Sequence, residues 1–142
     1  MPTEKERIER LGSVYLFEGL SDKELKAVAG RAKEIDHAQG KDIVTEDKSG
    51  VGFHLILEGE GQVLVHGETK GRLGAGDYFG EVSMIDGGPR AATVRADTPM
   101  RTLSVPAWQF KPLLEQPEIA RKLLLGMCKR LRESQEQDLK PI

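Results

Sequence analysis

The residues from Phe79 to Val94 carry the groups of this chain that are best suited to bind a small anion. Gly80 to Ile85 can form a single helical turn, and the free amides at the start of a helix attract negative charge. Gly80 also lacks the Cβ that would keep a ligand oxygen away from the backbone. Arg90 adds a permanent positive charge and a planar fork of donors that suits two phosphate oxygens. The segment therefore predicts a site for a phosphate group.

The neighbours of Arg90 predict that its side chain points into the protein. A Gly-Gly-Pro turn precedes it, and the small residues Ala91 and Ala92 follow it. We therefore expect this arginine to be held at a turn and directed inward. An inward arginine needs an anionic partner, because a buried charge without one is costly.

Glu81 is the residue that favours a nucleotide over a bare phosphate as the ligand of this segment. A carboxylate beside an anion site is electrostatically unfavourable unless it has a task of its own, and accepting a hydrogen bond from a ribose 2′-hydroxyl is such a task. Two structural roles compete with this one: an acid that complements the helix dipole, and an internal partner for Arg90. The spacing of Gly80, Glu81 and Arg90 favours the ribose contact.

A framework of short strands is predicted to position these residues. From Lys33 to Val105 the hydrophobic pattern has a period of two and is broken by glycine-rich turns. Such a pattern indicates a mainly β fold, a sandwich or jelly roll (a double-stranded β-helix), rather than a parallel α/β sheet. The expected strands are Asp42–Thr45, Phe53–Leu57, Gln62–His66, Lys70–Leu73, Ala91–Ala96 and Met100–Val105.

Helices are predicted on both sides of the strands. Ser21 and Glu24 form a capping box that starts a helix over about 22–30, after a short helical segment at Thr3–Arg10. A C-terminal helix pair covers about 107–115 and 118–134, with a break at Pro117. At 142 residues we expect one domain: a helical segment 1–31, a β-roll 32–106 with the binding segment 79–94, and C-terminal helices 107–135.

The 118–134 helix carries an apolar stripe formed by Ala120, Leu123, Leu124, Met127, Cys128 and Leu131. The stripe either packs on the β-roll or forms the seam of a homodimer, and Leu125 beside it supports the second interpretation. Trp108, at the start of the helix pair, is expected to be a packing anchor rather than a platform for a ligand.

Composition predicts a cytoplasmic protein without a nucleic-acid or membrane partner. The formal net charge is −2, which lacks the basic excess typical of nucleic-acid binding. Cys128, the single cysteine, has no partner for an internal disulfide and fits a reducing compartment. No apolar run approaches the roughly 20 residues of a membrane span.

The 79–94 segment resembles the phosphate-binding cassette of cyclic nucleotide-binding domains. Phe-Gly-Glu, a hydrophobic pair, Gly and Pro-Arg-Ala-Ala-Thr-Val are similar to the cassette of cAMP-dependent kinase regulatory subunits and catabolite-activator-type regulators. The similarity extends over about 11–134, through Leu16–Ser21, Gly76–Tyr78, Phe110, Pro117–Ala120 and Arg130-Leu131. The resemblance implies an eight-stranded β-roll with flanking helices that binds a cyclic nucleotide without converting it.

The resemblance also implies a set of ligand contacts. The amides around Gly80–Ser83 and Ala91-Ala92 would hold the cyclic phosphate, Arg90 would pair with it and Glu81 would bind the 2′-hydroxyl. The implied binding residues are Phe79, Gly80, Glu81, Val82, Ser83, Arg90, Ala91, Ala92 and, on a facing strand, Val63.

The identity of the base and the role of the last helix are finer predictions. In relatives that prefer cGMP a hydroxyl residue often follows the cassette arginine, whereas Ala91 stands here, so the resemblance favours cAMP over cGMP. Arg130 and Ser134 share one helix face, with Gln135 next to them. Similar positions reach the adenine in catabolite-activator-type proteins, so this helix is either a lid on the base or a solvated polar face.

Three alternatives compete with a cAMP sensor. A metal enzyme of the cupin type is disfavoured because His37, His54 and His66 form no H-x-H pair; we predict no catalytic residue, no metal and no cofactor besides the ligand. An interaction module with a degenerate site is disfavoured by the presence of both Glu81 and Arg90. The loop at 46–52 departs from the family pattern. No effector segment follows the C-terminal helices, so we expect the domain to signal either to an unknown effector protein or to the rest of a larger chain.

Overall fold

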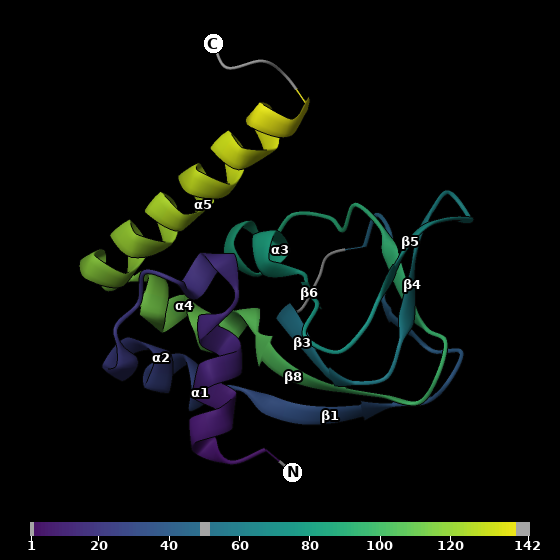
Figure 1. The fold of residues 1–142 in the computed structure, drawn as a ribbon, viewed down its shortest axis with the longest axis horizontal. Helices are drawn as coiled ribbons and strands as arrows, with labels where there is room; N and C mark the ends of the chain where they lie inside the picture. The colour runs from purple at the N-terminus through teal and green to yellow at the C-terminus, as the bar shows by residue number, and fades with distance from the viewer. Residues whose placement is uncertain (1, 49–51, 139–142) are drawn as a thin grey trace. The chain divides into compact units, whose positions relative to one another are not determined.

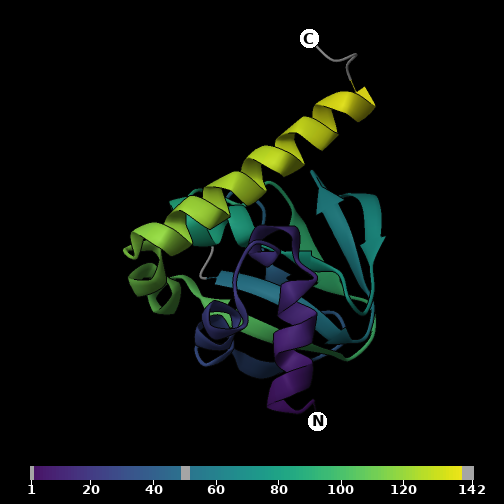
Figure 2. The ribbon, with the colours of Figure 1, turned by 60° about the vertical axis from the view of Figure 1, so that its left-hand side comes forward.

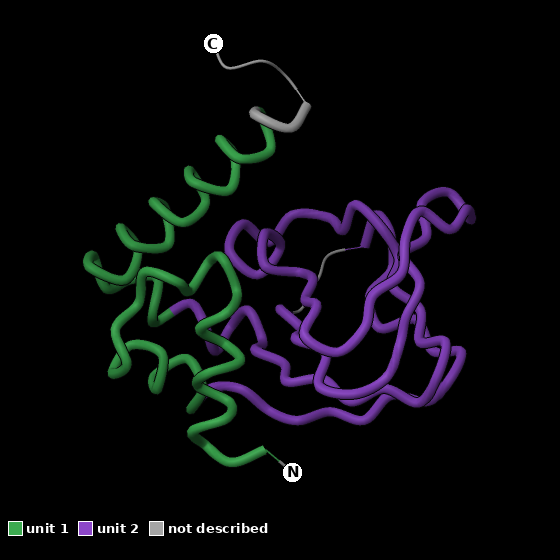
Figure 3. The backbone as a smooth tube through the Cα atoms, viewed as in Figure 1, with its two compact units in different colours: residues 1–30, 112–142 green, residues 31–111 purple. Residues whose placement is uncertain are grey.

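The computed structural model describes residues 2–48 and 52–138, with side chains up to residue 135. The chain divides into two compact units (Figure 3). The β unit comprises residues 31–111, and the helical unit comprises residues 1–30 and 112–142.

The β unit is built from two four-stranded antiparallel sheets (Figure 1). The strand order is β1-β8-β3-β6 in one sheet and β2-β7-β4-β5 in the other. This architecture confirms the predicted jelly roll. The strands are β1 Lys33–His37, β2 Asp42–Val44, β3 Gly52–Glu58, β4 Gly61–Val65, β5 Glu68–Leu73, β6 Tyr78–Phe79, β7 Thr93–Ala96 and β8 Met100–Pro106.

Strand β3 shows why the sheet holds together. Six of its seven residues are buried, and side chains alternate between the two faces of a strand. Phe53, Leu55 and Leu57 therefore share one face, and His54 and Ile56 share the other. On that second face Ile56 packs with Ala96 and Met100, and Phe79 is among the partly buried residues that contact this cluster.

A short helix, α3 (Glu81–Asp86), interrupts the strands between β6 and β7. Glycines in the left-handed conformation stand at both of its ends, Gly80 with φ 87° and Gly87 with φ 68°. A residue with a Cβ adopts such values only at a cost. The two glycines thus limit the helix to the segment in which the sequence predicted a single turn.

The helical unit contains α1 (Glu4–Gly12), the 3₁₀ turn η1 (Tyr15–Phe17), α2 (Asp22–Ala29) and the long α5 (Pro117–Asp138), which Figure 2 shows end to end. The predicted capping box is present: Glu24 N donates to Ser21 Oγ at 3.2 Å, and Ser21 N donates to Glu24 Oε1 at 2.8 Å. The helix α4 (Ala107–Leu114) lies at the boundary between the units along the chain. No helix within residues 2–48 and 52–138 is long and apolar enough to cross a bilayer.

Helix α5 packs against the rest of the helical unit through two Lys–Glu contacts and through a close approach of its backbone to η1. Lys122 Nζ lies 2.7 Å from Glu24 Oε1, and Lys129 Nζ lies 3.5 Å from Glu18 Oε2. A Cβ on Gly126 would stand only 3.1 Å from the carbonyl oxygen of Tyr15. The glycine therefore lets the helix backbone approach η1.

The apolar residues of α5 divide into a buried and an exposed set. Leu123 is buried, whereas Leu124, Leu131 and Cys128 are exposed. The predicted stripe is therefore only partly covered. Trp108 on α4 is 68% exposed, so the prediction that it anchors the packing was wrong.

Candidate functional site

A pocket of about 320 Å³ opens in the β unit, within the size range of small-molecule sites. All nine residues that the sequence predicted to contact a cyclic nucleotide line it. These residues are Val63 on β4, Phe79 on β6, Gly80 to Ser83 at the start of α3, and Arg90, Ala91 and Ala92 in the segment before β7.

The pocket has a further apolar wall that the sequence interpretation missed. Val44, Leu73, Tyr78 and Val94 line it from β2, β5, β6 and β7. Three of the four are aliphatic residues with no polar function, and only the alternation along their strands could have singled them out. This wall suits the apolar faces of a sugar or a base.

Arg90 is the buried charge of the pocket. The residue is 5% exposed, as the turn and the small neighbours predicted. Its Nη2 donates to the carbonyl oxygen of Gly52 at 2.6 Å. Nε and Nη1 are buried and have no hydrogen-bond partner among the residues that the structure describes. Two donors of this buried guanidinium are therefore unpaired within the described part of the chain.

Burial and a neighbouring carboxylate act in opposite directions on this arginine. Burial lowers the pKa of Arg90, because the charged form loses hydration, and the negative charge of Glu81 opposes that shift. The guanidinium is the more weakly hydrated of the two basic side-chain cations, which makes it the side chain suited to such a position. Glu81 itself lines the pocket at the first turn of α3.

Gly80 is required for a reason that the sequence did not reveal. A Cβ at this position would stand 2.2 Å from Arg90 Nη1 and 2.5 Å from the carbonyl oxygen of Gly52. The space next to Gly80 is thus filled by the arginine and by the strand, in addition to any ligand oxygen that approaches the α3 amides. Gly80 allows Arg90 to reach its place.

The main chain of Arg90 is hydrogen-bonded to the 46–48 turn. Its amide donates to the carbonyl oxygen of Lys48 at 2.9 Å, and its carbonyl oxygen accepts from Asp47 N at 2.8 Å. Asp47 has φ 64°, a conformation that glycine adopts more easily. The turn is the start of the 46–52 loop, in which the sequence departs from the family pattern. Residues 49–51 of that loop lie outside the described residues.

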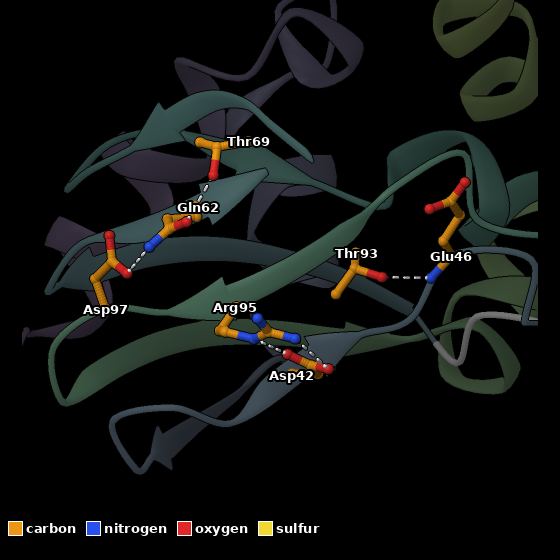
Figure 4. A network of polar contacts seen from close by, with 7 residues as sticks. All are labelled: Asp42, Glu46, Gln62, Thr69, Thr93, Arg95 and Asp97. Atoms are coloured by element: carbon orange, nitrogen blue, oxygen red, sulfur yellow. Dashed lines mark hydrogen bonds and ion pairs between the residues drawn. The ribbon is translucent and has the colours of Figure 1, made fainter. Parts of the chain in front are cut away.

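The same turn is tied to the second sheet through Glu46. Its amide donates to Thr93 Oγ1 at 2.9 Å (Figure 4). Its carboxylate accepts from the amide of His66, at the tip of the β4–β5 hairpin, at 2.8 Å. The loop that holds Arg90 is thereby connected to β7 and to the turn between β4 and β5.

The three residues predicted to contact the base lie on α5, in the helical unit. The Arg130 guanidinium stands over the Tyr15 ring, 5.5 Å from its centroid, a distance typical of a cation–π contact. Ser134 and Gln135 are exposed. Their contact with a base stays a prediction.

Within the described ranges, no group of three or more His, Cys, Asp or Glu side chains is arranged to hold a metal ion. His37 and His54 are buried in the β unit, and His66 lies at the hairpin tip. Ser83 is buried in the first turn of α3. The charged side chains that line the pocket are Arg90 and Glu81.

Comparisons with known proteins agree with this geometry. The sequence model of the family described as "Cyclic nucleotide-binding domain" matches residues 34–117. A cAMP-dependent protein kinase regulatory subunit from Mycosarcoma maydis is 33% identical over 113 residues, which cover 73% of this chain and 22% of that protein. The chain thus spans about a fifth of the length of this relative.

Two solved structures have a similar fold. The N-terminal domain of a transcriptional regulator from Streptomyces coelicolor A3(2) has a TM-score of 0.79 and 26% identity, over 92% of this chain and 95% of that one. A cyclic nucleotide-binding domain from Methylobacillus flagellatus has a TM-score of 0.73 and 29% identity, over 94% of this chain and 81% of that one.

Proposed function

The chain belongs to the cyclic nucleotide-binding domain family, and on that premise we propose that it is a regulatory module that senses cAMP. The observation that carries the proposal is the buried Arg90, whose Nε and Nη1 have no partner among the described residues and which lines a pocket of about 320 Å³. A buried cation is costly unless it is paired and hydrogen-bonded, and the nearby charge of Glu81 does not restore the lowered pKa of Arg90. A cyclic phosphate would supply further negative charge and hydrogen-bond acceptors.

The pocket residues suggest how the ligand lies. The phosphate pairs with Arg90 and accepts from the amides at the start of α3 and at Ala91-Ala92. Glu81 accepts a hydrogen bond from the ribose 2′-hydroxyl. Val63 and the apolar wall contact the ribose or the base. No bond of the ligand is broken, so the module acts by binding and not by catalysis.

The proposal favours cAMP over cGMP. Ala91 follows the cassette arginine and lines the pocket, and a methyl group offers guanine no hydrogen bond. A site that lacks the matching polar group discriminates by leaving a polar group of the wrong ligand unpaired.

The proposed output is a rearrangement of α5. In the structure Arg130 contacts Tyr15, and with ligand bound Arg130, Ser134 and Gln135 would contact the base. A ligand shifts such an equilibrium only by its preference for one state. The rearrangement would expose or hide a surface for an effector protein.

A homodimer through the 118–134 helix is the second part of the proposed output. Leu124 and Leu131 are 62% and 61% exposed and stand seven residues apart, with Cys128 between them. Residues at this spacing share a helix face. The face is suited to pack against the same helix of a second copy.

Calorimetric titration of nucleotide-stripped protein with cAMP, and then with cGMP, tests the proposal. We expect one-site binding with the tighter affinity for cAMP. Hydrogen exchange of residues 118–135, measured with and without saturating cAMP, tests the rearrangement. Absence of binding to either nucleotide would refute the sensor and leave the interaction module; unchanged exchange would refute the role of α5 alone.

A further inference from the structure

The carboxylate of Glu46 is largely buried although it does not line the pocket. Glu46 follows β2, and its side chain is 16% exposed. Carboxylates are mostly exposed unless they are paired, and both oxygens of this one lie against a single residue. Oε1 accepts from the amide of His66 at 2.8 Å, and Oε2 lies 3.2 Å from His66 Nε2. The partner of Glu46 is therefore the turn of the β4–β5 hairpin, 20 residues further along the chain.

The turn of this hairpin has a conformation that glycine adopts more easily than histidine. Val65 at the end of β4 pairs with Glu68 at the start of β5, so His66 and Gly67 form a two-residue turn. Their φ angles are 52° and 81°, and positive values at both positions are typical of a type I′ turn. A side chain makes this conformation costly. Since a hydrogen bond to a carboxylate is stronger than one to a neutral acceptor, Glu46 stabilises His66 in the conformation that the turn requires.

The β4–β5 hairpin carries part of the pocket lining. Val63 on β4 and Leu73 on β5 line the pocket. Strand β5 lies at the edge of the sheet β2-β7-β4-β5, next to β4, and four of its six residues are exposed. A strand with so little buried surface is held by few contacts. The contact of Glu46 with the turn therefore has a large share in fixing the position of the hairpin.

The main chain beside this carboxylate binds the segment that carries Arg90. The amide of Glu46 donates to Thr93 Oγ1 at 2.9 Å (Figure 4). The amide of Asp47 donates to the carbonyl oxygen of Arg90 at 2.8 Å, and the carbonyl oxygen of Lys48 accepts from the amide of Arg90 at 2.9 Å. One short segment thus binds the hairpin through the side chain of Glu46 and binds Arg90 through its main chain.

We propose that Glu46 is a positioning residue of the binding site: it holds the β4–β5 hairpin, with Val63 and Leu73, at a fixed place relative to Arg90. This inference rests on the proposed function of the pocket. A nucleotide whose phosphate pairs with Arg90 and whose ribose or base contacts Val63 joins the two segments. Binding is tighter when such segments are already ordered, because less conformational entropy is lost on binding. Glu46 acts through the hairpin and does not itself touch the ligand.

Amide hydrogen exchange of the nucleotide-free protein provides the first test. In the wild type we expect the amide of His66 to be protected, because it donates to Glu46. The same amide should exchange about tenfold faster in Glu46→Ala, and Glu46→Gln should keep part of the protection, since the side-chain carbonyl of glutamine still accepts. Equal exchange of this amide in the wild type and in Glu46→Ala would overturn the proposal. This readout needs no nucleotide, so it is independent of the proposed function.

Binding provides the second test. We expect Glu46→Ala to weaken cAMP binding roughly three- to tenfold, and Glu46→Gln to recover part of the loss. Glu68→Ala is the matched control and should bind as the wild type does, because it removes a carboxylate of the same hairpin whose partner is the exposed Lys70, 3.1 Å away. Wild-type affinity in a folded Glu46→Ala protein would overturn the positioning role.

A double-mutant cycle with Val63 distinguishes positioning from a general loss of stability. If Glu46 acts through the hairpin, the losses of cAMP affinity in Glu46→Ala and Val63→Ala should not add in the double variant, because both changes affect the same contact with the ligand. Fully additive losses would overturn the proposal. Absence of cAMP binding by the wild type would refute the function of the pocket and, with it, the role of Glu46 in binding.

Discussion

Arg90 and Arg95 lie five residues apart and show two opposite environments for the same side chain. Arg95, on β7, holds Asp42 on the neighbouring β2 with both ends of its fork, Nε to Oδ1 at 2.7 Å and Nη2 to Oδ2 at 3.3 Å (Figure 4). This pair is exposed. Arg90 is buried and donates only to a carbonyl oxygen, with Nε and Nη1 unpartnered among the described residues.

The pKa values of the two arginines shift in opposite directions for this reason. The hydrogen bond and the charge of Asp42 raise the pKa of Arg95, whereas burial lowers the pKa of Arg90. An arginine with its own carboxylate is a structural element of the sheet. A buried arginine with two donors unpartnered among the described residues is instead the side chain that we propose to pair with a ligand.

The largest effect should come from truncating each arginine in turn. Arg90→Ala removes the cation that faces the phosphate, and we expect cAMP affinity to fall about a hundredfold or more. Arg95→Ala, the matched control, should bind within about twofold of the wild type because its partner is Asp42. Calorimetry on both variants makes the comparison. Wild-type affinity in a folded Arg90→Ala protein would contradict the assignment of the site.

Filling the space beside Gly80 with a methyl group should have the next largest effect. Gly80→Ala adds a Cβ 2.2 Å from Arg90 Nη1, at φ 87°. Gly40→Ala carries the same backbone strain, about 1–2 kcal/mol, at φ 85° with nothing within 4 Å. We expect Gly80→Ala to be the less stable variant in urea unfolding and to lose cAMP affinity. Equal stability and equal affinity would show that the position of Arg90 does not depend on Gly80.

Glu81 tests whether the site distinguishes a nucleotide from a bare phosphate. Glu81→Gln should weaken cAMP binding about tenfold, the typical effect of a lost hydrogen bond to a charged group. The same variant should bind 2′-deoxy-cAMP as the wild type does, because that ligand lacks the hydroxyl. Equal losses for the two ligands would mean that Glu81 acts on Arg90 or on the helix dipole instead.

The smallest effect is expected for the exposed pair of Arg95 and Asp42. Asp42→Asn leaves Arg95 in contact with water, so the melting temperature should fall by no more than about 2 °C. Salt should reduce the difference further, because exposed ion pairs are screened. Thermal melts at low and high salt measure this. A large loss of stability would show that the surface pair, and not the core, holds β2 to β7.

The fold was largely predictable from the sequence because its signals are local. The alternation of apolar and polar residues predicted most of the strands, and the Ser21–Glu24 capping box predicted the start of α2. Both signals come from side chains that are only a few residues apart in the sequence. Two strands were missed, β1 and the two-residue β6, since they are defined by pairing across the sheet with β8 and β3. The exposure of Trp108 was missed for a similar reason: burial depends on the partners that the fold provides.

Most residues that line the pocket were predictable, but the groups that hold Arg90 in place were not. Nine pocket residues could be named because the cassette is one continuous segment plus Val63. The carbonyl oxygens of Gly52 and Lys48, which accept hydrogen bonds from Arg90, come from distant segments, and their residue types carry no signal of that role. Their contribution arises only when β3 and the 46–48 turn are brought beside Arg90.

Arginine side-chain NMR would test the central claim most directly, because one spectrum of the wild-type protein contains both arginines. The Nε–H signals are assigned with Arg90→Lys and Arg95→Lys, and cAMP is then added. The account predicts that the Arg90 signal moves on binding and that the Arg95 signal stays in place. A bound state in which the Arg90 signal does not move would contradict it.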